Sequence, residues 1–408
     1  MLDQGASDLF LEADAPPAYR IHGKVVRTRL PAPSEADMRR YIESILTPVG
    51  KQRFEQSPDL DLAHTLPGKG RFRINLFMHQ GRLGLVARAI PLEKLDWEQL
   101  GLPPVLREMA DQKQGLILVV GPTGCGKSTT LAAMLQHIYQ NRAEHIVTIE
   151  DPIEFIHQPE QGLVHQRQVG IDTESFATAL RHVVRQNPDV VMLGELRDTD
   201  TIQTVFSAAL TGHLILSTLH TSGVAQSIDR MLNYFDPIAR RQAQNDLATT
   251  LVGIVSMRLV PRKDGLGRVP VFEILRGTPT VRRLLIENRL IELHDIMKRS
   301  ADLGMCTLNQ SLVKLTNQGL IDTETAARYA PNREEYQLNI EGMYTGVDSI
   351  GVREQAQRLA AAPGTSGTPG TTPGTGKRSA STPPPMKSQP TPKRDPLAPA
   401  DPSREIEL

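Results

Sequence analysis

Short apolar runs alternate with turn residues over residues 1–92, a pattern that is typical of β-strands joined by tight turns. Between two pairs of runs, Ser34 can cap a helix, because its hydroxyl can accept a hydrogen bond from a free backbone N–H group. The runs that we predict as strands lie at 19–21, 25–26, 72–77 and 83–89. The side chains that recur at helical spacing, and should pack on the sheet, are Met38, Tyr41, Ile42 and Ile45. We therefore predict a small α+β domain.

Apolar strands alternate with helices from residue 115 to about residue 203, and one further strand follows. The runs that we predict as strands lie at 116–120, 146–149, 190–193 and 214–219. One intervening helix presents an apolar face formed by Phe176, Leu180, Val183 and Val184. Strands without polar alternation, separated by helices, predict an α/β fold with a parallel sheet that is covered on both faces. Residues 270–330 are expected to be mostly helical.

Two segments lie outside these patterns. The connecting stretch at 91–114 contains a Pro-Pro pair and the single tryptophan, Trp97. It could form a hinge or an element that packs between domains, and we favour plain packing for Trp97. After about residue 350, Pro, Gly, Thr and Ser dominate, and such a composition buries too little apolar surface to offset its chain entropy. This tail is expected to be a plain linker, the alternative being a polyproline segment that binds a partner. The predicted domains are 1–92, 93–350 and a disordered tail at 351–408.

Composition narrows the class of protein and its surroundings. The 46 basic and 46 acidic residues cancel, so no long-range field favours nucleic acid or an anionic membrane. No basic stripe interleaved with aromatic residues is visible either, so we expect a protein partner and no nucleic acid. Two distant cysteines are too few for a disulfide framework or a zinc site. No apolar run is long enough to span a bilayer. The first residues lack the features of an export signal. We expect a cytoplasmic protein.

The strongest chemical signal is Gly-Pro-Thr-Gly-Cys-Gly-Lys-Ser at 121–128, directly after an apolar strand and before a helical run. Glycines allow backbone N–H groups to turn towards phosphate oxygens, Lys127 brings positive charge to the outer phosphates, and the Ser128 hydroxyl can bind Mg²⁺. The alternative is a chance glycine-rich turn. We predict a site for ATP and Mg²⁺ that is formed by Gly121, Pro122, Thr123, Gly124, Cys125, Gly126, Lys127, Ser128 and Thr129.

Acidic residues follow two further strands, at the sheet edge where ligands bind in parallel sheets. Glu150 could hold Mg²⁺ or orient water, the alternative being a solvated turn that caps a helix. Glu195 is our candidate for the carboxylate that polarises the attacking water. Its alternative is a surface glutamate paired with Arg197, which we disfavour because Gly194 permits an unusual backbone.

Two histidines flank the predicted strand at 214–219. A lone histidine at a strand end is usually a hydrogen-bonding cap. His220 lies at the carboxyl end of its strand, as the acidic residues do, so we predict that it reports the state of the γ-phosphate to the rest of the domain. His213 lies at the opposite end and is a weaker candidate.

Four segments, in this order and spacing, resemble the Walker A, Asp-box, Walker B and His-box motifs of the type II/type IV secretion ATPase family. They lie at 121–128, 149–154, 189–198 and 211–221. Over residues 7–330 the chain is most similar to the PilT/PilU branch, in which ATP hydrolysis drives type IV pilus retraction and twitching motility. The resemblance implies a RecA-like P-loop ATPase core preceded by a small PAS-like domain, assembled as a homo-hexamer. It further implies a cytoplasmic position at the inner-membrane pilus base, through a platform protein there.

The resemblance also implies that each amino-terminal domain leans over the nucleotide of a neighbouring subunit and contributes arginines. Arg73 and Arg88 occupy the matching positions. A guanidinium delivered in this way would stabilise the charge that develops on the transferred phosphoryl group. Without the family, each could equally be an exposed strand arginine.

Departures from the family pattern leave alternatives for the function. Segments 280–285, 297–300 and 304–307 look closer to PilU, the accessory paralogue, than to PilT. The chain could therefore be an ATP-binding ring subunit that acts with a PilT-like paralogue. A pilus assembly or type II secretion ATPase is the other alternative, although the four-cysteine zinc insertion usual in that branch is missing from this sequence.

Overall fold

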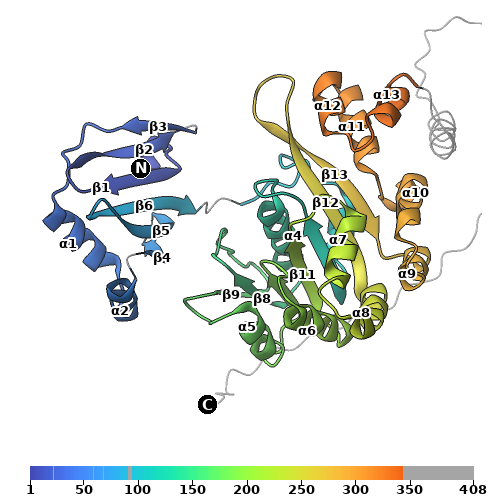
Figure 1. The fold of residues 1–408 in the computed structure, drawn as a ribbon, viewed down its shortest axis with the longest axis horizontal. Helices are drawn as coiled ribbons and strands as arrows, with labels where there is room; N and C mark the ends of the chain where they lie inside the picture. Colours follow the sequence, from blue (N-terminus) through green and yellow to red (C-terminus); the bar gives the residue numbers. More distant parts are fainter. Residues whose placement is uncertain (22, 58, 68, 91–93, 343–408) are drawn as a thin grey trace, which may run out of the picture. The chain divides into compact units, whose positions relative to one another are not determined.

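The computed structural model describes residues 1–342, apart from 22, 58, 68 and 91–93. The predicted tail at 351–408 and the predicted boundary between residues 92 and 93 lie outside the described residues. Two sheets organise the described chain, and each is considered by itself (Figure 1).

The amino-terminal sheet has six strands in the order β3-β2-β1-β6-β5-β4, and every neighbouring pair is antiparallel. The four predicted strands are confirmed, whereas β1 and β4, whose residues alternate less clearly, were not predicted. The strands are β1 (Asp8–Glu12), β2 (Ala15–Ile21), β3 (Lys24–Arg27), β4 (Leu60–Leu66), β5 (Gly70–His79) and β6 (Arg82–Ile90). A single 3₁₀ turn, η1 (Leu2–Gln4), precedes them.

Helix α1 (Glu35–Ile45) begins where the sequence predicts, because Ser34 and Asp37 form a capping box. Met38 and Ile42 are fully buried against the sheet, each at a gain of about 1.5–3 kcal/mol. Tyr41 was expected on this buried face but is 44% exposed, since it lies about 100° around the helix from Ile42. Helix α2 (Pro48–Gln56) follows.

The second sheet has seven strands in the order β13-β12-β7-β11-β10-β8-β9. All neighbouring pairs are parallel except β12 with β13, so the predicted parallel sheet carries one antiparallel edge strand. The strands are β7 (Gly115–Val120), β8 (His145–Glu150), β9 (Leu163–Gln168), β10 (Val190–Leu193), β11 (Leu214–Leu219), β12 (Leu251–Pro261) and β13 (Arg268–Arg276).

The expectation of helix from residue 270 onwards is wrong for β13. Its apolar side chains at 271, 272, 274 and 275 fit helical spacing as well as a strand. The pairing with β12, from Gly253 with Arg276 to Pro261 with Arg268, decides for the strand. The helices predicted around Leu284, Ile296, Leu312 and Ala326 are present.

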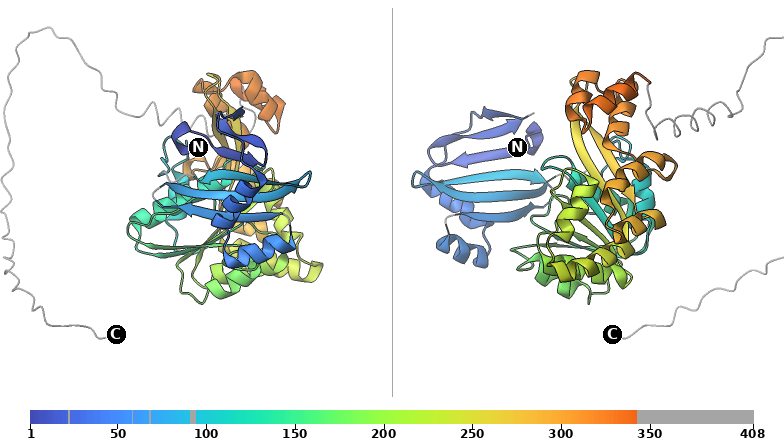
Figure 2. Two further views of the ribbon diagram at one scale, coloured as in Figure 1. Left: turned by 90° about the vertical axis from the view of Figure 1, so that its left-hand side faces the viewer. Right: turned by 45° about the vertical axis from the view of Figure 1, so that its right-hand side comes forward.

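Helices cover both faces of the second sheet, as predicted (Figure 2). Alternation along β7 sends Ile117 and Val119 into the core beneath α3 (Val105–Ala110) and α4 (Lys127–Asn141), whereas Leu116 and Leu118 join the opposite core. The helices on that opposite face are α5 (Phe176–Val183), α6 (Thr199–Leu210), α7 (Val224–Leu232), α8 (Pro237–Thr250) and α9 (Pro279–Ile286). The helices on both faces hold in place the strand ends at which the site residues lie.

The remaining helices follow the β12–β13 hairpin, and α11, α12 and α13 share a small core with Val260, Val269 and Val271. These elements are η2 (Leu290–Glu292), α10 (Leu293–Arg299), η3 (Ala301–Leu303), α11 (Leu308–Asn317), α12 (Thr323–Tyr329) and α13 (Arg333–Ile340). Trp97 is buried and donates from Nε1 to the Leu102 carbonyl at 2.9 Å, so its predicted packing role is confirmed. Within the part of the chain that the structure describes, no helix combines the length and apolarity needed to cross a membrane.

Candidate active site

The predicted phosphate loop connects the end of β7 to the start of α4. Gly121 has φ +149°, and a Cβ atom there would lie 2.4 Å from the Met257 carbonyl oxygen, so only glycine fits. Gly124 has φ +76° with open space beside it, which lets a ligand approach the backbone closely. Helix α4 is 15 residues long, and the free N–H groups of its first turn favour an anion.

Lys127, the first residue of α4, folds back over the loop. Its ammonium donates to the Gly121 carbonyl at 3.0 Å and the Pro122 carbonyl at 3.1 Å. Burial lowers the pKa of Lys127, and the neighbouring Cys125 and Glu195 act against this shift. The ammonium therefore lies at the loop, where phosphate oxygens would replace carbonyls as its acceptors.

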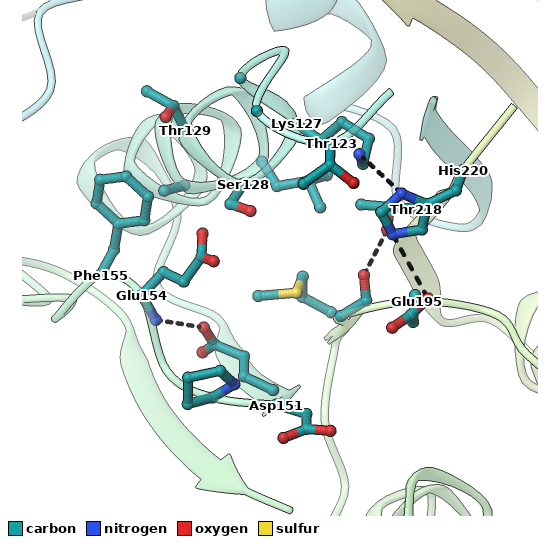
Figure 3. Close-up of a pocket in the computed structure, with 18 of the residues that line it drawn as sticks. Thr123, Lys127, Ser128, Thr129, Asp151, Glu154, Phe155, Glu195, Thr218 and His220 are labelled. Carbon is teal, nitrogen blue, oxygen red and sulfur yellow. Dashed lines mark hydrogen bonds and ion pairs between the residues drawn. The ribbon is translucent and has the colours of Figure 1, made fainter. Parts of the chain in front are cut away.

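Oxygen donors face the other side of the loop. Figure 3 shows the Ser128 hydroxyl and the Glu154 carboxylate pointing towards one another, and Glu150 lines the same cavity of about 540 Å³. Hydroxyl and carboxylate oxygens are the ligands that Mg²⁺ prefers. Among the described residues, no three His, Cys, Asp or Glu side chains come close enough to hold a metal alone. The donor set therefore fits Mg²⁺ that is bound together with phosphate oxygens and water.

Glu150 ends β8 and is buried. Burial raises the pKa of its carboxyl, and hydrogen bonds from Thr148 and Gln166 act in the opposite direction. No ion pair joins Glu150 to a lysine, arginine or histidine in the described chain. A carboxylate that is buried without a positive partner is costly to maintain, and such groups are concentrated at functional sites.

Glu195 follows β10 and lines the same cavity. It is paired with Arg197, the alternative that we disfavoured, and its Oε2 atom also lies 3.6 Å from Nε2 of His220. The argument from Gly194 was wrong, because its φ is not in the left-handed region. A Cβ atom there would make a tight contact of 3.3 Å with the ring of Phe176, so a larger residue would require that ring to move slightly.

His220 follows the carboxyl end of β11 and bridges the two sides of the site (Figure 3). Its Nδ1 atom is 3.5 Å from the Lys127 ammonium and its Nε2 atom is 3.6 Å from Glu195. Burial, and then the charge of Lys127, lower the pKa of His220, so the ring is neutral and Nδ1 accepts. His213, at the other end of β11, instead contacts the Ala208 carbonyl at 2.9 Å, as a capping histidine does.

Arg73 and Arg88 lie in the amino-terminal sheet, directly opposite one another on β5 and β6. The same cross-strand row continues through Asp8 on β1 to Arg20 on β2. Asp8 is buried and binds Arg88 at 2.7 Å and Arg20 at 3.2 Å. Three guanidinium groups therefore share this row with a single carboxylate.

Both predicted arginines remain accessible. The side chain of Arg88 is 65% exposed and that of Arg73 is 44% exposed, with Asp61 at 3.8 Å from Arg73. Like charges placed directly opposite one another on a sheet are destabilising. Within this sheet, Asp8 offsets the charge of Arg88, and Asp61 lies close to Arg73.

Several residues around the cavity were missed by reasoning from the sequence. They are Phe155, His157, Phe176, Met192, Thr218, Leu259 and Arg268. His157 packs edge-on against Tyr139, and burial lowers the pKa of His157 to about 4. The Thr218 hydroxyl donates to the Gly194 carbonyl at 2.6 Å. Met192 and Thr218 lie within two of the four motif segments, but nothing in their residue type distinguishes them from their neighbours as residues of the cavity.

A glycine loop between a buried parallel strand and a helix, with carboxylates at the ends of two neighbouring strands, defines a P-loop ATPase. The family model described as "Type II/IV secretion system protein" matches residues 2–269. This chain belongs to the type II/IV secretion system protein family.

Comparison with individual proteins agrees with the family. The chain is 40% identical over 333 residues to the type IV pilus retraction ATPase PilT of Pseudomonas aeruginosa, covering 82% of this chain and 96% of that protein. It is 38% identical over 340 residues to the type IV pilus ATPase PilU of the same organism, covering 83% and 89%. A crystal structure of the pilus retraction motor PilT with bound ADP matches with a TM-score of 0.77 at 40% identity, covering 82% of this chain and 96% of that one.

Proposed function

We propose that this chain is an ATP-hydrolysing motor that powers retraction of a type IV pilus. The observation that carries the proposal is the cavity in which Lys127, Ser128, Glu150, Glu195 and His220 converge. Support for the biological role comes from the match to PilT over 96% of the length of that protein.

In the proposed reaction the loop amides and Lys127 hold the β- and γ-phosphates of ATP. Ser128 and Glu150, with Glu154 as a further oxygen donor, would hold Mg²⁺, which neutralises charge on the phosphates when it is bound. Glu195 polarises the attacking water, and Arg197 forms an ion pair with the same carboxylate. His220, between Lys127 and Glu195, changes its contacts when the γ-phosphate leaves.

We infer that the motor is a ring of six identical subunits. The exposed pair Arg73 and Arg88 would meet the nucleotide of a neighbouring subunit, and the phosphate charge would relieve their mutual repulsion. Asp8 holds Arg88 in place for this contact. Burial alone would raise the pKa of the Asp8 carboxyl, but hydrogen bonds from Ser7 and Arg88 lower it, and the net pKa is below its ordinary value. ATP would then clamp two subunits, and phosphate release would free them, so that chemistry becomes rigid-body motion.

The partners follow from the same role. A retraction motor must act on the platform protein of the pilus at the inner membrane, so we propose peripheral attachment through that protein. A second ring made of a PilT-like paralogue is a further proposed partner, since identity to PilT (40%) and PilU (38%) is nearly equal.

Cells that lack this chain test the role. We expect surface pili to persist while twitching and fibre disassembly are lost, and the wild-type gene to restore both. A Glu195→Gln gene should restore neither, although its product should still bind ATP and form the ring. Loss of pili from the cell surface would instead indicate an assembly motor, and unchanged twitching would contradict the proposal.

A further inference from the structure

The edge strand β9 approaches Glu150 from the side. In β8, Thr148 and Glu150 are two residues apart and so share one face of the sheet. The parallel pairing of β9 with β8 sets Gln166 beside Thr148. Register thus places the Gln166 amide next to the Glu150 carboxylate, although 16 positions separate them.

Both N–H donors and the carbonyl oxygen of the Gln166 amide form hydrogen bonds within this region. Its Nε2 atom donates to Glu150 Oε1 at 3.1 Å and to the Phe155 carbonyl at 2.8 Å. Its Oε1 atom accepts from the His157 N–H group at 3.0 Å. One side chain thus binds the carboxylate and both ends of a short stretch of the loop that follows β8.

The two carboxylate oxygens of Glu150 have different hydrogen-bond partners. Oε1 accepts from Thr148 at 2.6 Å and from Gln166 at 3.1 Å, whereas Oε2 has only a long contact of 3.4 Å from the Glu154 N–H group. The anchored oxygen fixes the carboxyl plane. The other oxygen remains available for the chemistry in the cavity.

We propose that Gln166 is a positioning residue for ATP hydrolysis, which locks the Glu150 carboxylate so that Oε2 faces the bound nucleotide. This inference rests on the proposed function, because it assigns Glu150 a working role in hydrolysis. Misplacement of a reacting group by about 1 Å can cost on the order of 100-fold in rate, so loss of one of two anchors should cost roughly 10- to 100-fold.

The experiment compares Gln166→Met with wild type in the full-length protein. We expect kcat to fall roughly 10- to 100-fold while KM and the affinity for ADP stay nearly unchanged. In a Glu150→Gln background the same Gln166→Met change should cause almost no further loss, because the anchored group is then already inactive. A crystal structure of nucleotide-free Gln166→Met protein should show Glu150 in another rotamer.

Two matched controls separate positioning from general effects on the strand and loop. Gln161→Met makes the same chemical change at an exposed residue just before β9 and should leave kcat unchanged. Gln168, the cross-strand partner of Glu150, accepts from the Ile153 N–H group at 3.5 Å and forms no side-chain hydrogen bond with Glu150 in the described chain. Gln168→Met therefore removes a contact to the same loop but keeps the anchor of the carboxylate, and it should affect kcat much less than Gln166→Met. Thermal unfolding of each variant reports folding directly.

If Gln166→Met does not fold, Gln166→Glu replaces it. That variant keeps the length of the side chain and the acceptor for His157 but loses the donor to Glu150, so its kcat should fall at least as far. Wild-type kcat in the folded variant, or equal losses in both backgrounds, would overturn the inference. A wild-type protein without any ATP turnover would instead overturn the proposed function.

Discussion

Replacing Glu150 by glutamine should slow hydrolysis strongly, to a low but measurable rate, and yet stabilise the nucleotide-free protein. The carboxyl is 7% exposed, and burial raises its pKa above the ordinary value of 4.5. Below that ordinary value both folded and unfolded chains carry the protonated acid, so ionisation costs nothing. As pH rises, the unfolded chain ionises first, and stability is lost until the pH passes the folded pKa. Glutamine, which stays neutral, avoids this loss.

The size of the effect follows from the contacts of Glu150. Burial of an unpaired carboxylate costs several kcal/mol, and each good hydrogen bond to the charged group returns about 1.5–3 kcal/mol. Thr148 and Gln166 supply two such bonds, and the third, from Glu154, is long at 3.4 Å. A net cost of about 1–2 kcal/mol remains, and its removal should raise the unfolding midpoint by roughly 2–8 °C for a domain of this size.

The assay is thermal unfolding of wild type and Glu150→Gln without nucleotide and with a chelator present, at about pH 5 and about pH 8. The advantage of the variant should be small at the lower pH and larger at the higher pH. Excess Mg-ADP should reduce the difference, because a bound cation compensates the charge in wild type only. A variant that is less stable than wild type at both pH values, or a difference that does not change with pH, would refute the reasoning.

Four further changes test other parts of the structure. Gly121→Ala should prevent tight nucleotide binding in calorimetry, because the new Cβ atom would lie 2.4 Å from a backbone oxygen. Cys125→Ser should retain turnover, and wild type should react slowly with thiol reagents at neutral pH, since burial raises the pKa of the Cys125 thiol. Glu335→Ala should lower the free energy of unfolding by about 3 kcal/mol in a denaturant titration, because Glu335 is mostly buried with Lys298 and also binds Asn309. Arg73→Ala should lower kcat in the assembled ring but leave ATP affinity nearly unchanged; an equal loss of both would contradict its proposed role in the transition state.

Much of the fold is readable from the sequence because its signals are local. Mostly apolar runs, with few polar residues among them, predicted the four central strands of the second sheet, and Ser34 marked the start of α1. The phosphate loop is equally local, since eight consecutive residues define both its backbone and its ligands. The strand at 268–276 was missed because its four apolar residues fit the spacing of a helix as well as that of a strand. Only the pairing with β12 shows that the segment is a strand.

The site beyond its motifs depends on non-local pairing, which the sequence does not display. Gln166 reaches Glu150 only through the register of β9 on β8, and β9 itself alternates weakly. The row formed by Arg20, Asp8, Arg88 and Arg73 joins the β1–β2 pair to the β5–β6 pair, which is far from it along the chain. Gly194 was predicted to adopt an unusual backbone, whereas the structure shows ordinary φ there and a close approach to the ring of Phe176, which depends on packing.

The most direct measurement of the central claim is the release of inorganic phosphate from Mg-ATP by the purified full-length chain, alone and mixed with a PilT-like protein as the proposed partner. The account predicts turnover that depends on Mg²⁺ and disappears in the Lys127→Ala and Glu195→Gln variants. A rate no higher than that of Lys127→Ala in both mixtures would contradict it.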